Sequence, residues 1–420
     1  MLSDEEAAVL AAVDEAAVGR TLLELVAIPS VTGSPAESEL QHHLAGRLER
    51  LGLDVDLWSM DLPALLAPGF PGMEVAREEA WGLVGRTDGG ADGPTLILQG
   101  HVDVVPPGDL AAWQGDPFVP RVTGDVVHGR GACDMKAGLA AQLAALAAVR
   151  AAGVRLRGRV AVHFVVGEED GGIGAFGTLR RGHGGDACVI AEPTAGTVIT
   201  ANAGALTFRI TVPGKAAHAS SREAGVSAID GYLPLHRALA RLEAERNRDP
   251  DPLLAEYPIP YSLSVGTLRS GDWASSVPDL LVAEGRLGVR LGEDPAAARA
   301  ALERCVAEAC AGDDWLRAHP ATVTWPGGQF ASGRLEPGHP LRDTVAAAYA
   351  DATGAARPRE RGATYGSDLR HYTGAGIPTL QFGPGDIAVA HSAREHVSLR
   401  EVVDAARTLA VTVLRTVGTK

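Results

Sequence analysis

The sequence predicts an α/β protein, and two patterns along the chain carry this prediction. The first is a set of apolar runs rich in β-branched residues, at 96–98, 160–166 and 187–190. An Ala- and Leu-rich helical pattern at 137–152 lies between the first two runs and ends before Gly153. Strand, helix and strand at this spacing are typical of a mixed, largely parallel sheet covered by helices.

The second pattern is a change in the middle of the chain. Strand patterns at 206–212, 281–283 and 321–325 alternate with helical patterns at 227–246 and 295–309. This order indicates a compact α+β insert within the α/β domain, whose pattern resumes near residue 339. The expected organisation is a first domain made of residues 1–202 and 331–420, interrupted by a smaller domain of residues 203–330.

The first long helix is expected to begin at a capping box. Ser34-Pro35-Ala36-Glu37 has a capping serine, proline at the first helical position and glutamate three residues after the serine. Leucines at 40, 44, 48 and 51 then form an apolar stripe that ends before Gly52. We therefore expect an amphipathic helix between Pro35 and Gly52.

Composition excludes several classes of function. The chain has 420 residues, enough for two cores, and a formal net charge of −14, which argues against nucleic acid or an anionic membrane as partner. No run of eighteen apolar residues is present, so we expect no membrane span. The acidic N-terminus is unlike a secretory signal, and the four cysteines lack metal-site spacing. A cytoplasmic protein with reduced thiols is expected.

Histidine and carboxylate side chains follow the predicted strands. His101, Glu168 and Glu192 each come just after an apolar run, where ligands of parallel sheets collect. Asp103 lies two residues after His101 and so points to the same side, where it can orient the imidazole. Asp134 follows a glycine-rich turn before the predicted helix, and its alternative role is that of a helix N-cap.

Two further residues complete the candidate set. Glu169 follows Glu168 directly, so that one of the two can bind a metal while the other faces substrate as a base. His391 lies in a Gly- and Pro-rich loop. Taken singly, these residues are also compatible with a solvated acidic turn or a surface histidine. Together they form a mixture of imidazole and carboxylate without cysteine, which is typical of hydrolytic zinc, manganese or cobalt sites.

One motif indicates a different chemistry and is rejected. The glycines of Gly172-Ile173-Gly174-Ala175-Phe176-Gly177 match a dinucleotide-binding pattern after a strand. Three carboxylates, at residues 168–170, lie between that strand and the first glycine. They would repel a pyrophosphate, so we do not expect a nucleotide site.

Longer motifs resemble a known enzyme family across nearly the whole chain. Trp113-Gln114-Gly115-Asp116-Pro117-Phe118, followed by the segment from Gly129 to Lys136, is specific for it. The sequence resembles the co-catalytic zinc amidohydrolases that include acetylornithine deacetylase, succinyl-diaminopimelate desuccinylase, aminoacylase-1 and glutamate carboxypeptidase. Gly271-Asp272-Trp273 is most similar to the deacetylase-like branch. The resemblance implies two Zn²⁺ per subunit, with Co²⁺ as a possible substitute, and an insert that acts as a lid through which two subunits dimerise.

The resemblance also implies roles for the candidate residues. His101 and Glu192 would bind one zinc, Glu169 and His391 the other, and Asp134 would bridge both. Asp103 would orient His101, and Glu168 would be the general base. His218, in Gly214-Lys215-Ala216-Ala217-His218-Ala219, would reach the partner subunit's site and stabilise an oxyanion there.

Substrate contacts are less well defined by the resemblance. Many relatives have Asn-x-Ile-Pro where this chain has Ser275-Ser276-Val277-Pro278, and Asp where it has Gly288. Arg290 is a candidate lid contact that this departure puts in question. Gly366 and Arg370 belong to a loop that lies near substrate in the family. Arg370 is interpreted either as a carboxylate ligand or as a member of a structural ion pair.

The expected function is hydrolysis of the amide bond of an N-acyl amino acid or related N-acyl amine by a zinc-activated bridging water. A dipeptidase or carboxypeptidase of the same family, acting on a dipeptide, is the close alternative. A non-catalytic binding protein with the same fold and a nucleotide-binding oxidoreductase are the distant ones. The expected partners are the small-molecule substrate and a second copy of the chain.

Overall fold

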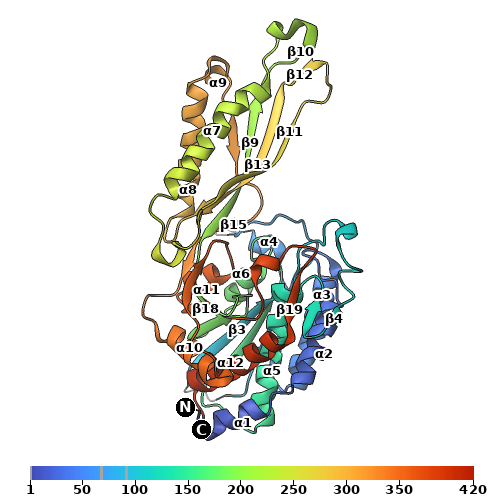
Figure 1. The fold of residues 1–420 in the computed structure, drawn as a ribbon, viewed down its shortest axis with the longest axis vertical. Coiled ribbons are helices and arrows are strands. Elements are labelled where there is room, and N and C mark those ends of the chain that lie inside the picture. The colour runs from blue at the N-terminus through green and yellow to red at the C-terminus, as the bar shows by residue number, and fades with distance from the viewer. Residues whose placement is uncertain (1, 67–69, 90–92) are drawn as a thin grey trace.

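The computed structural model describes residues 2–66, 70–89 and 93–420. The molecule is elongated, with a larger domain that carries both chain ends and a smaller domain stacked on its far side (Figure 1). The chain crosses to the smaller domain between β8 (Val198–Asn202) and β9 (Gly204–Pro213), and it is back in the larger sheet at β16 (Gly333–Arg334).

The larger domain is built on a nine-stranded mixed sheet in the order β1-β2-β6-β3-β7-β18-β8-β16, with β17 beside β8. The central strands β6, β3, β7 and β18 are parallel, and antiparallel strands lie on both sides of them. The α/β class with a largely parallel centre is therefore confirmed. The remaining strands are β1 (Asp54–Ser59), β2 (Trp81–Arg86), β3 (Thr95–His101), β6 (Arg159–Val165), β7 (Ala187–Ile190), β17 (Glu360–Ala363) and β18 (Thr379–Gln381).

The central strands are mostly apolar because helices cover both faces of the sheet. In β3, Leu96 and Leu98 join the main core, whereas Ile97 joins a second cluster beside α6 and α11. Alternate side chains of a strand point to opposite faces, which explains the continuous apolar run. The helices are α1 (Asp4–Ala11), α2 (Glu15–Val26), α3 (Pro35–Arg50), α4 (Leu62–Leu65), α5 (Ala137–Ala151), α6 (Ile173–Arg180), α10 (Pro340–Thr353), α11 (Leu369–Gly374) and α12 (Leu399–Val417).

The smaller domain is an antiparallel sheet in the order β11-β13-β9-β14, with β15 beside β9. Its helices supply an apolar core with the sheet, in which Phe208, Leu235 and Leu302 are fully buried. The short strands β10 and β12 pair at the tip farthest from the larger domain (Figure 1). The bounds are β10 (Ala217–His218), β11 (Leu263–Ser270), β12 (Ser276–Val277), β13 (Leu280–Val289), β14 (Thr322–Thr324), β15 (Gln329–Phe330), α7 (Ala228–Arg246), α8 (Pro295–Ala311) and α9 (Asp314–Ala318).

A three-stranded sheet on the larger domain lies beside the loops of the site. It consists of β4 (Arg121–Thr123), β5 (Val126–His128) and β19 (His396–Ser398), in the order β19-β5-β4. Short 3₁₀ turns lie at Leu110–Ala112, Ala219–Ala224, Pro252–Leu254 and Ile387–Val389.

The start of α3 differs from the sequence prediction in one respect. The helix begins at Pro35 after Ser34, as expected, but Ser34 makes no side-chain cap bond and the capping box is not formed. Glu37 instead accepts hydrogen bonds from Arg77 and from the backbone of Gly33 and Gly167. Leaving a buried arginine without a carboxylate partner costs more free energy than leaving a helix N-terminus without a second cap. Glu37 therefore pairs with Arg77 and does not form the local capping box.

One helical stretch in the described part of the chain, Ala132–Ala151, is long and apolar enough by composition to cross a membrane. In the structure 89% of its most apolar window is buried. It packs against α2 and α12, which is the position of a core helix.

Candidate active site

The candidate site lies where three neighbouring parallel strands end. His101 is the last residue of β3, Glu168 follows β6, and Glu192 follows β7. Because β6, β3 and β7 are adjacent and parallel, their carboxyl ends meet at one edge of the sheet. The sheet therefore brings together the three side chains that the strand pattern had singled out.

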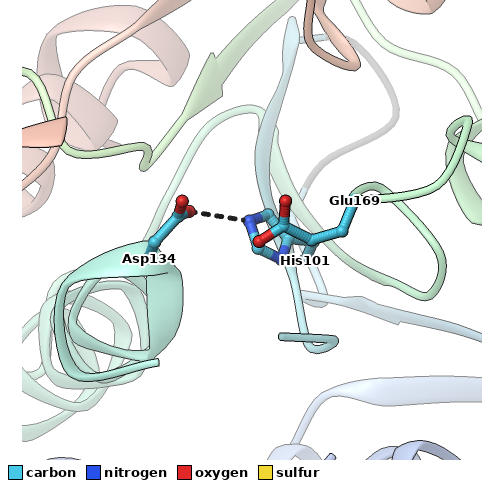
Figure 2. Close-up of side chains that lie close together, drawn as sticks. All are labelled: His101, Asp134 and Glu169. Atoms are coloured by element: carbon cyan, nitrogen blue, oxygen red, sulfur yellow. Dashed lines mark hydrogen bonds and ion pairs between the residues drawn. The ribbon is translucent and has the colours of Figure 1, made fainter. Parts of the chain in front are cut away.

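His101 is buried, and both of its ring nitrogens have oxygen neighbours. Its Nε2 lies 3.1 Å from Oδ1 of Asp134 and 3.7 Å from Oε1 of Glu192. Its Nδ1 lies 2.8 Å from the backbone carbonyl of Asp103. A proton on Nδ1 is donated to that carbonyl, which leaves the Nε2 lone pair directed at the carboxylates. Figure 2 shows Asp134 directed at this imidazole, with Glu169 beside it.

The role expected for Asp103 is only partly met. Its backbone oxygen orients His101, whereas its carboxylate oxygen is 3.6 Å from Nδ1. The carboxylate instead accepts the backbone N–H groups of Glu168 and Glu169. A buried carboxylate is best satisfied by several donors, and the turn after β6 offers two amides.

Asp134 lies between two histidines. Its Oδ1 faces His101, and its Oδ2 is 3.4 Å from Nε2 of His391. Nε2 of His391 is also 3.1 Å from both carboxylate oxygens of Glu169. The loop holds His391 at a φ of 56°, and its side chain is half exposed. Asp134 thus presents one oxygen to His101, which lies beside Glu192, and the other oxygen to His391, which lies beside Glu169. This arrangement is suited to bridging two cations.

The donor atoms are close enough to share cations. Ligand atoms of His101, Asp134 and Glu169 lie within 4.8 Å of one another, as do those of His101, Glu168 and Glu192. Imidazole and carboxylate groups without thiolate are the donors that zinc, manganese and cobalt accept. The residues present therefore fit a metal centre.

Electrostatics support the same conclusion. Burial, together with repulsion from Asp368, raises the pKa of Glu168 well above its usual range. Burial also raises the pKa of Glu192 and of Glu169. Burial would also raise the pKa of Asp134. Hydrogen bonds from His101 and His391 outweigh this effect, so the pKa of Asp134 is lowered. Several carboxylates buried at one point repel each other, and bound cations would relieve that repulsion.

Asp134 is held by a residue that the sequence interpretation did not include. Oε1 of Glu395 accepts the backbone N–H of Cys133 and of Asp134, each at 3.1 Å. Its other oxygen pairs with the buried Arg130. Nothing in the sequence distinguishes Glu395 from the many exposed glutamates, because its role depends on two loops that meet only in the fold.

The site opens into a cavity of about 320 Å³ between the two domains. The larger domain contributes the carboxylates and His391, and the smaller domain contributes Thr207, Arg286 and Phe330. Gly366, predicted as a substrate contact, lines this cavity. Arg286, Glu74 and Tyr365 also line it and were not predicted.

Residues 97–415 match the model of peptidase family M20/M25/M40. The chain belongs to this family. It is 32% identical over 399 residues to a succinyl-diaminopimelate desuccinylase of Gluconacetobacter diazotrophicus, over 90% of this chain and 92% of that protein. It is 28% identical over 400 residues to an N-formyl-4-amino-5-aminomethyl-2-methylpyrimidine deformylase of Bacillus subtilis, over 87% and 86%. A tripeptidase from Staphylococcus aureus has a similar fold, with a TM-score of 0.74, 22% identity, and coverage of 96% and 99%.

Membership in the M20/M25/M40 family confirms the resemblance that the motifs indicated. The family is metal-dependent, which agrees with the donor set around Asp134. The similarity in fold to the S. aureus tripeptidase extends over 96% of this chain and therefore includes residues of both domains.

Two arginines predicted near substrate do not line the candidate cavity of this M20-family chain. Arg370 is buried, donates to the backbone carbonyls of Ser367 and Gly171, and stacks 4.0 Å above the ring of Phe330, which covers it from the cavity. Arg290 donates to backbone carbonyls at the end of α7 and lines a different surface hollow. Each guanidinium donates hydrogen bonds to backbone carbonyl oxygens instead.

His218 is also outside the cavity. It lies in β10 at the tip of the smaller domain, exposed, with Nδ1 at 2.7 Å from the hydroxyl of Ser220. Strand β10, which carries His218, lies at the end of the smaller domain that is farthest from the larger domain (Figure 1). Any role in catalysis requires a second subunit.

The rejected dinucleotide motif has a packing explanation. Gly172 begins α6 with a φ of 79°, and a Cβ there would lie 2.5 Å from Oδ1 of Asp368. A Cβ at Gly174 would meet the carbonyl of Val166 at 2.3 Å. The glycines let α6 approach the end of β6 closely.

Proposed function

We propose that this chain is a metal-dependent amidohydrolase that cleaves the amide bond of an N-acyl amino acid or related N-acyl amine. One observation carries the proposal: a buried carboxylate, Glu168, faces the same cavity as an imidazole–carboxylate cluster suited to two cations. The two relatives named above, a desuccinylase and a deformylase, both remove acyl groups from nitrogen, which supports an N-acyl substrate.

The donor geometry supports specific ligand roles. We assign His101 and Glu192 to one ion, Glu169 and His391 to the other, and Asp134 to both, because its two oxygens face the two imidazoles. Zn²⁺ is the proposed metal and Co²⁺ a substitute, since both accept mixed imidazole and carboxylate ligands. Bound ions of this kind polarise an amide carbonyl and lower the pKa of water.

Glu168 is the proposed general base. Its raised pKa, caused by burial and by the nearby Asp368, favours proton uptake at the cavity wall. As water adds to the amide carbon, Glu168 takes the proton that the water loses. It then transfers this proton to the amide nitrogen as the C–N bond breaks, so that acid and amine leave with balanced charge. Asp103 fixes the turn that carries Glu168 through its backbone amide.

Arg286 is the proposed substrate-binding residue of the smaller domain. It is exposed to the cavity and lies opposite the acidic wall formed by the larger domain. The guanidinium is suited to bidentate binding of a carboxylate such as that of an amino acid. Arg290, expected in this role, is occupied by backbone carbonyls.

A panel of N-acyl amino acids and dipeptides tests the proposal through release of primary amine. Each compound is assayed with chelated protein and again after Zn²⁺ is restored. Zinc-dependent release from acyl amino acids supports deacylation, and silence across the panel with zinc bound contradicts it. Glu168→Gln should keep its metal content and lose activity by roughly 10²–10⁴-fold, because only the proton acceptor is removed.

A peptidase is the second candidate, because Arg286 in the cavity lining could bind the free carboxylate of a peptide as well as that of an acyl amino acid. The tripeptidase fold is consistent with it. Release of primary amine from dipeptides alone in the same panel would support a peptidase. Arg286→Met should then weaken binding of every substrate with a free carboxylate and raise KM more than it lowers kcat.

We also propose a homodimer formed through the smaller domain. β11 is an edge strand, and large apolar side chains are exposed on the same domain: Ile229 and Leu233 on α7, and Leu268 on β11, are 42–50% exposed. An unpaired strand edge and exposed apolar side chains on the same domain both favour association. Light scattering should give twice the mass of the 43.4 kDa chain.

We further propose a cytoplasmic location, because the four cysteines are free thiols.

A further inference from the structure

The small sheet β19-β5-β4 has two chemically different faces. Across its three strands, Val122, Val127 and Val397 lie opposite one another, and the last two are buried in the core. One residue away, Arg121 lies opposite His128, and His128 lies opposite His396. Because alternate residues point to opposite faces and opposed residues share a face, three basic side chains form a row away from the core.

This basic row lines a cavity of about 270 Å³ that is separate from the catalytic one. Arg394, Trp113 and Gln114 complete its walls. The loop before β19 lies between the two cavities, since His391 lines the catalytic cavity and Arg394 lines the basic one.

In the part of the chain that the structure describes, the two arginines of this cavity are not paired with carboxylates. Neither Arg121 nor Arg394 forms an ion pair with another residue in the described ranges. Arg121 donates only to the neutral side chains of Thr123 and Gln114. The acidic residue of the lining, Asp116, accepts the backbone N–H of Phe118. In a chain with a net charge of −14, such a concentration of unpaired cations is unexpected on composition.

Two histidines contribute ring nitrogens to the same cavity. The ring centroids of His128 and His396 are 5.6 Å apart. Burial lowers the pKa of His128, and repulsion from Arg121 and His396 lowers it further. Nδ1 of His396 is 2.7 Å from the carbonyl of Arg394, so its proton is donated there, and Nε2 donates to an anion only when the ring is protonated. When either ring is protonated, like charges lie opposed across the sheet, which is destabilising, and a bound anion would offset that repulsion.

We propose that this cavity binds a multivalent oxyanion, either a phosphate group or the carboxylates of a polycarboxylic acid. Arg121 and Arg394 supply planar donor groups suited to such oxygens. The two imidazoles supply further donors when protonated. The site does not depend on the proposed hydrolytic function.

The site is linked to the catalytic centre through one short segment. Arg394 and His396 face the basic cavity, and Glu395 between them turns the other way to hold the amides of Cys133 and Asp134. An anion bound by Arg394 and His396 therefore restrains the segment that supports Asp134.

Calorimetric titration of the metal-loaded protein with inorganic phosphate, and separately with tricarballylate, tests the proposal at constant ionic strength. Combined Arg121→Gln and Arg394→Gln should weaken binding at least tenfold. Arg248→Gln, an exposed arginine of the smaller domain, is the matched control and should bind as wild type. His396→Gln provides a second variant, with thermal unfolding as a check on folding.

Each outcome decides the question. Phosphate binding alone, or tricarballylate binding alone, identifies the source of the oxyanion. Binding that survives the double Arg variant but is lost in His391→Ala belongs to the metal centre and overturns the proposal. Absence of binding to wild type, or equal weak binding by all variants, also overturns it.

Discussion

The carboxylate of Asp103 accepts the backbone N–H of Glu168 at 3.1 Å and that of Glu169 at 3.2 Å. One buried residue therefore positions both the proposed base and a proposed metal ligand. Thr32 donates its hydroxyl to the same carboxylate at 2.9 Å. The turn after β6 is thus fixed by two backbone donors, and Thr32 helps to hold the carboxylate that accepts them.

Replacing Asp103 should impair catalysis through this turn. Asp103→Asn places an amide NH₂ against one of two backbone donors, which costs about 1–3 kcal/mol for the group left unsatisfied. We expect kcat to fall by at least tenfold with a smaller change in KM. Steady-state kinetics with metal analysis checks this. Thr32→Val, which removes one donor but keeps the carboxylate, is the control, and an equal loss in both variants would contradict the prediction.

Arg77 should be important for stability. It is buried and pairs with Glu37 at 2.9 Å and with Asp170 at 3.4 Å. Arg77→Met leaves both carboxylates without a cation, and breaking a buried pair in this way costs about 3–5 kcal/mol. Urea unfolding should show this loss. Arg77→Met combined with Glu37→Gln should recover part of it, and a double variant no more stable than the single one would exclude the pairing as the cause.

Acid stability should depend on His163. Burial lowers the pKa of this side chain from 6.5 to about 3, and the ring faces the hydroxyl of Tyr372 at 3.1 Å. The unfolded chain therefore binds a proton below pH 6.5 that the folded chain refuses until about pH 3. Stability should fall through this window by up to about 1.4 kcal/mol per pH unit. Unfolding of His163→Gln should depend less steeply on pH over the same range, and an unchanged slope would contradict this.

Metal removal should affect both activity and stability. Chelation leaves Glu169, Glu192 and Asp134 to repel one another, so the melting temperature should fall together with activity. Adding Zn²⁺ or Co²⁺ should restore both. Glu192→Gln should bind metal at least tenfold more weakly while folding normally, because it loses one proposed ligand. A melting temperature insensitive to chelation would argue against metal at this cluster.

Mixing two inactive variants tests the role of the partner subunit. Glu168→Gln lacks the base and His218→Ala lacks the proposed contribution of the partner. In a mixed dimer one of the two sites has both residues, so equal mixing should restore about a quarter of wild-type activity. Activity no greater than the sum of the separate variants would place His218 outside the catalytic reaction.

Much of the site was predictable because the strands are short apolar runs followed by polar residues. His101, Glu168 and Glu192 each mark such a strand end, and parallel pairing brings those ends to one edge. Arg290 and Arg370 were not predictable in the same way. Both are arginines near the expected substrate region. The position of each guanidinium depends on which backbone carbonyls need a hydrogen-bond donor in the folded chain.

By itself the sequence determined the α/β class, the interrupted order of elements and the set of imidazole and carboxylate groups, because these follow from periodicity and residue type. The tertiary structure alone decided which guanidinium faces the catalytic cavity, Arg286 and not Arg290, and that Glu395 supports Asp134. It also decided that Arg121, His128 and His396 share one face of a small sheet. These relationships join residues far apart along the chain, and local pattern carries no information about contacts created by strand register and loop packing.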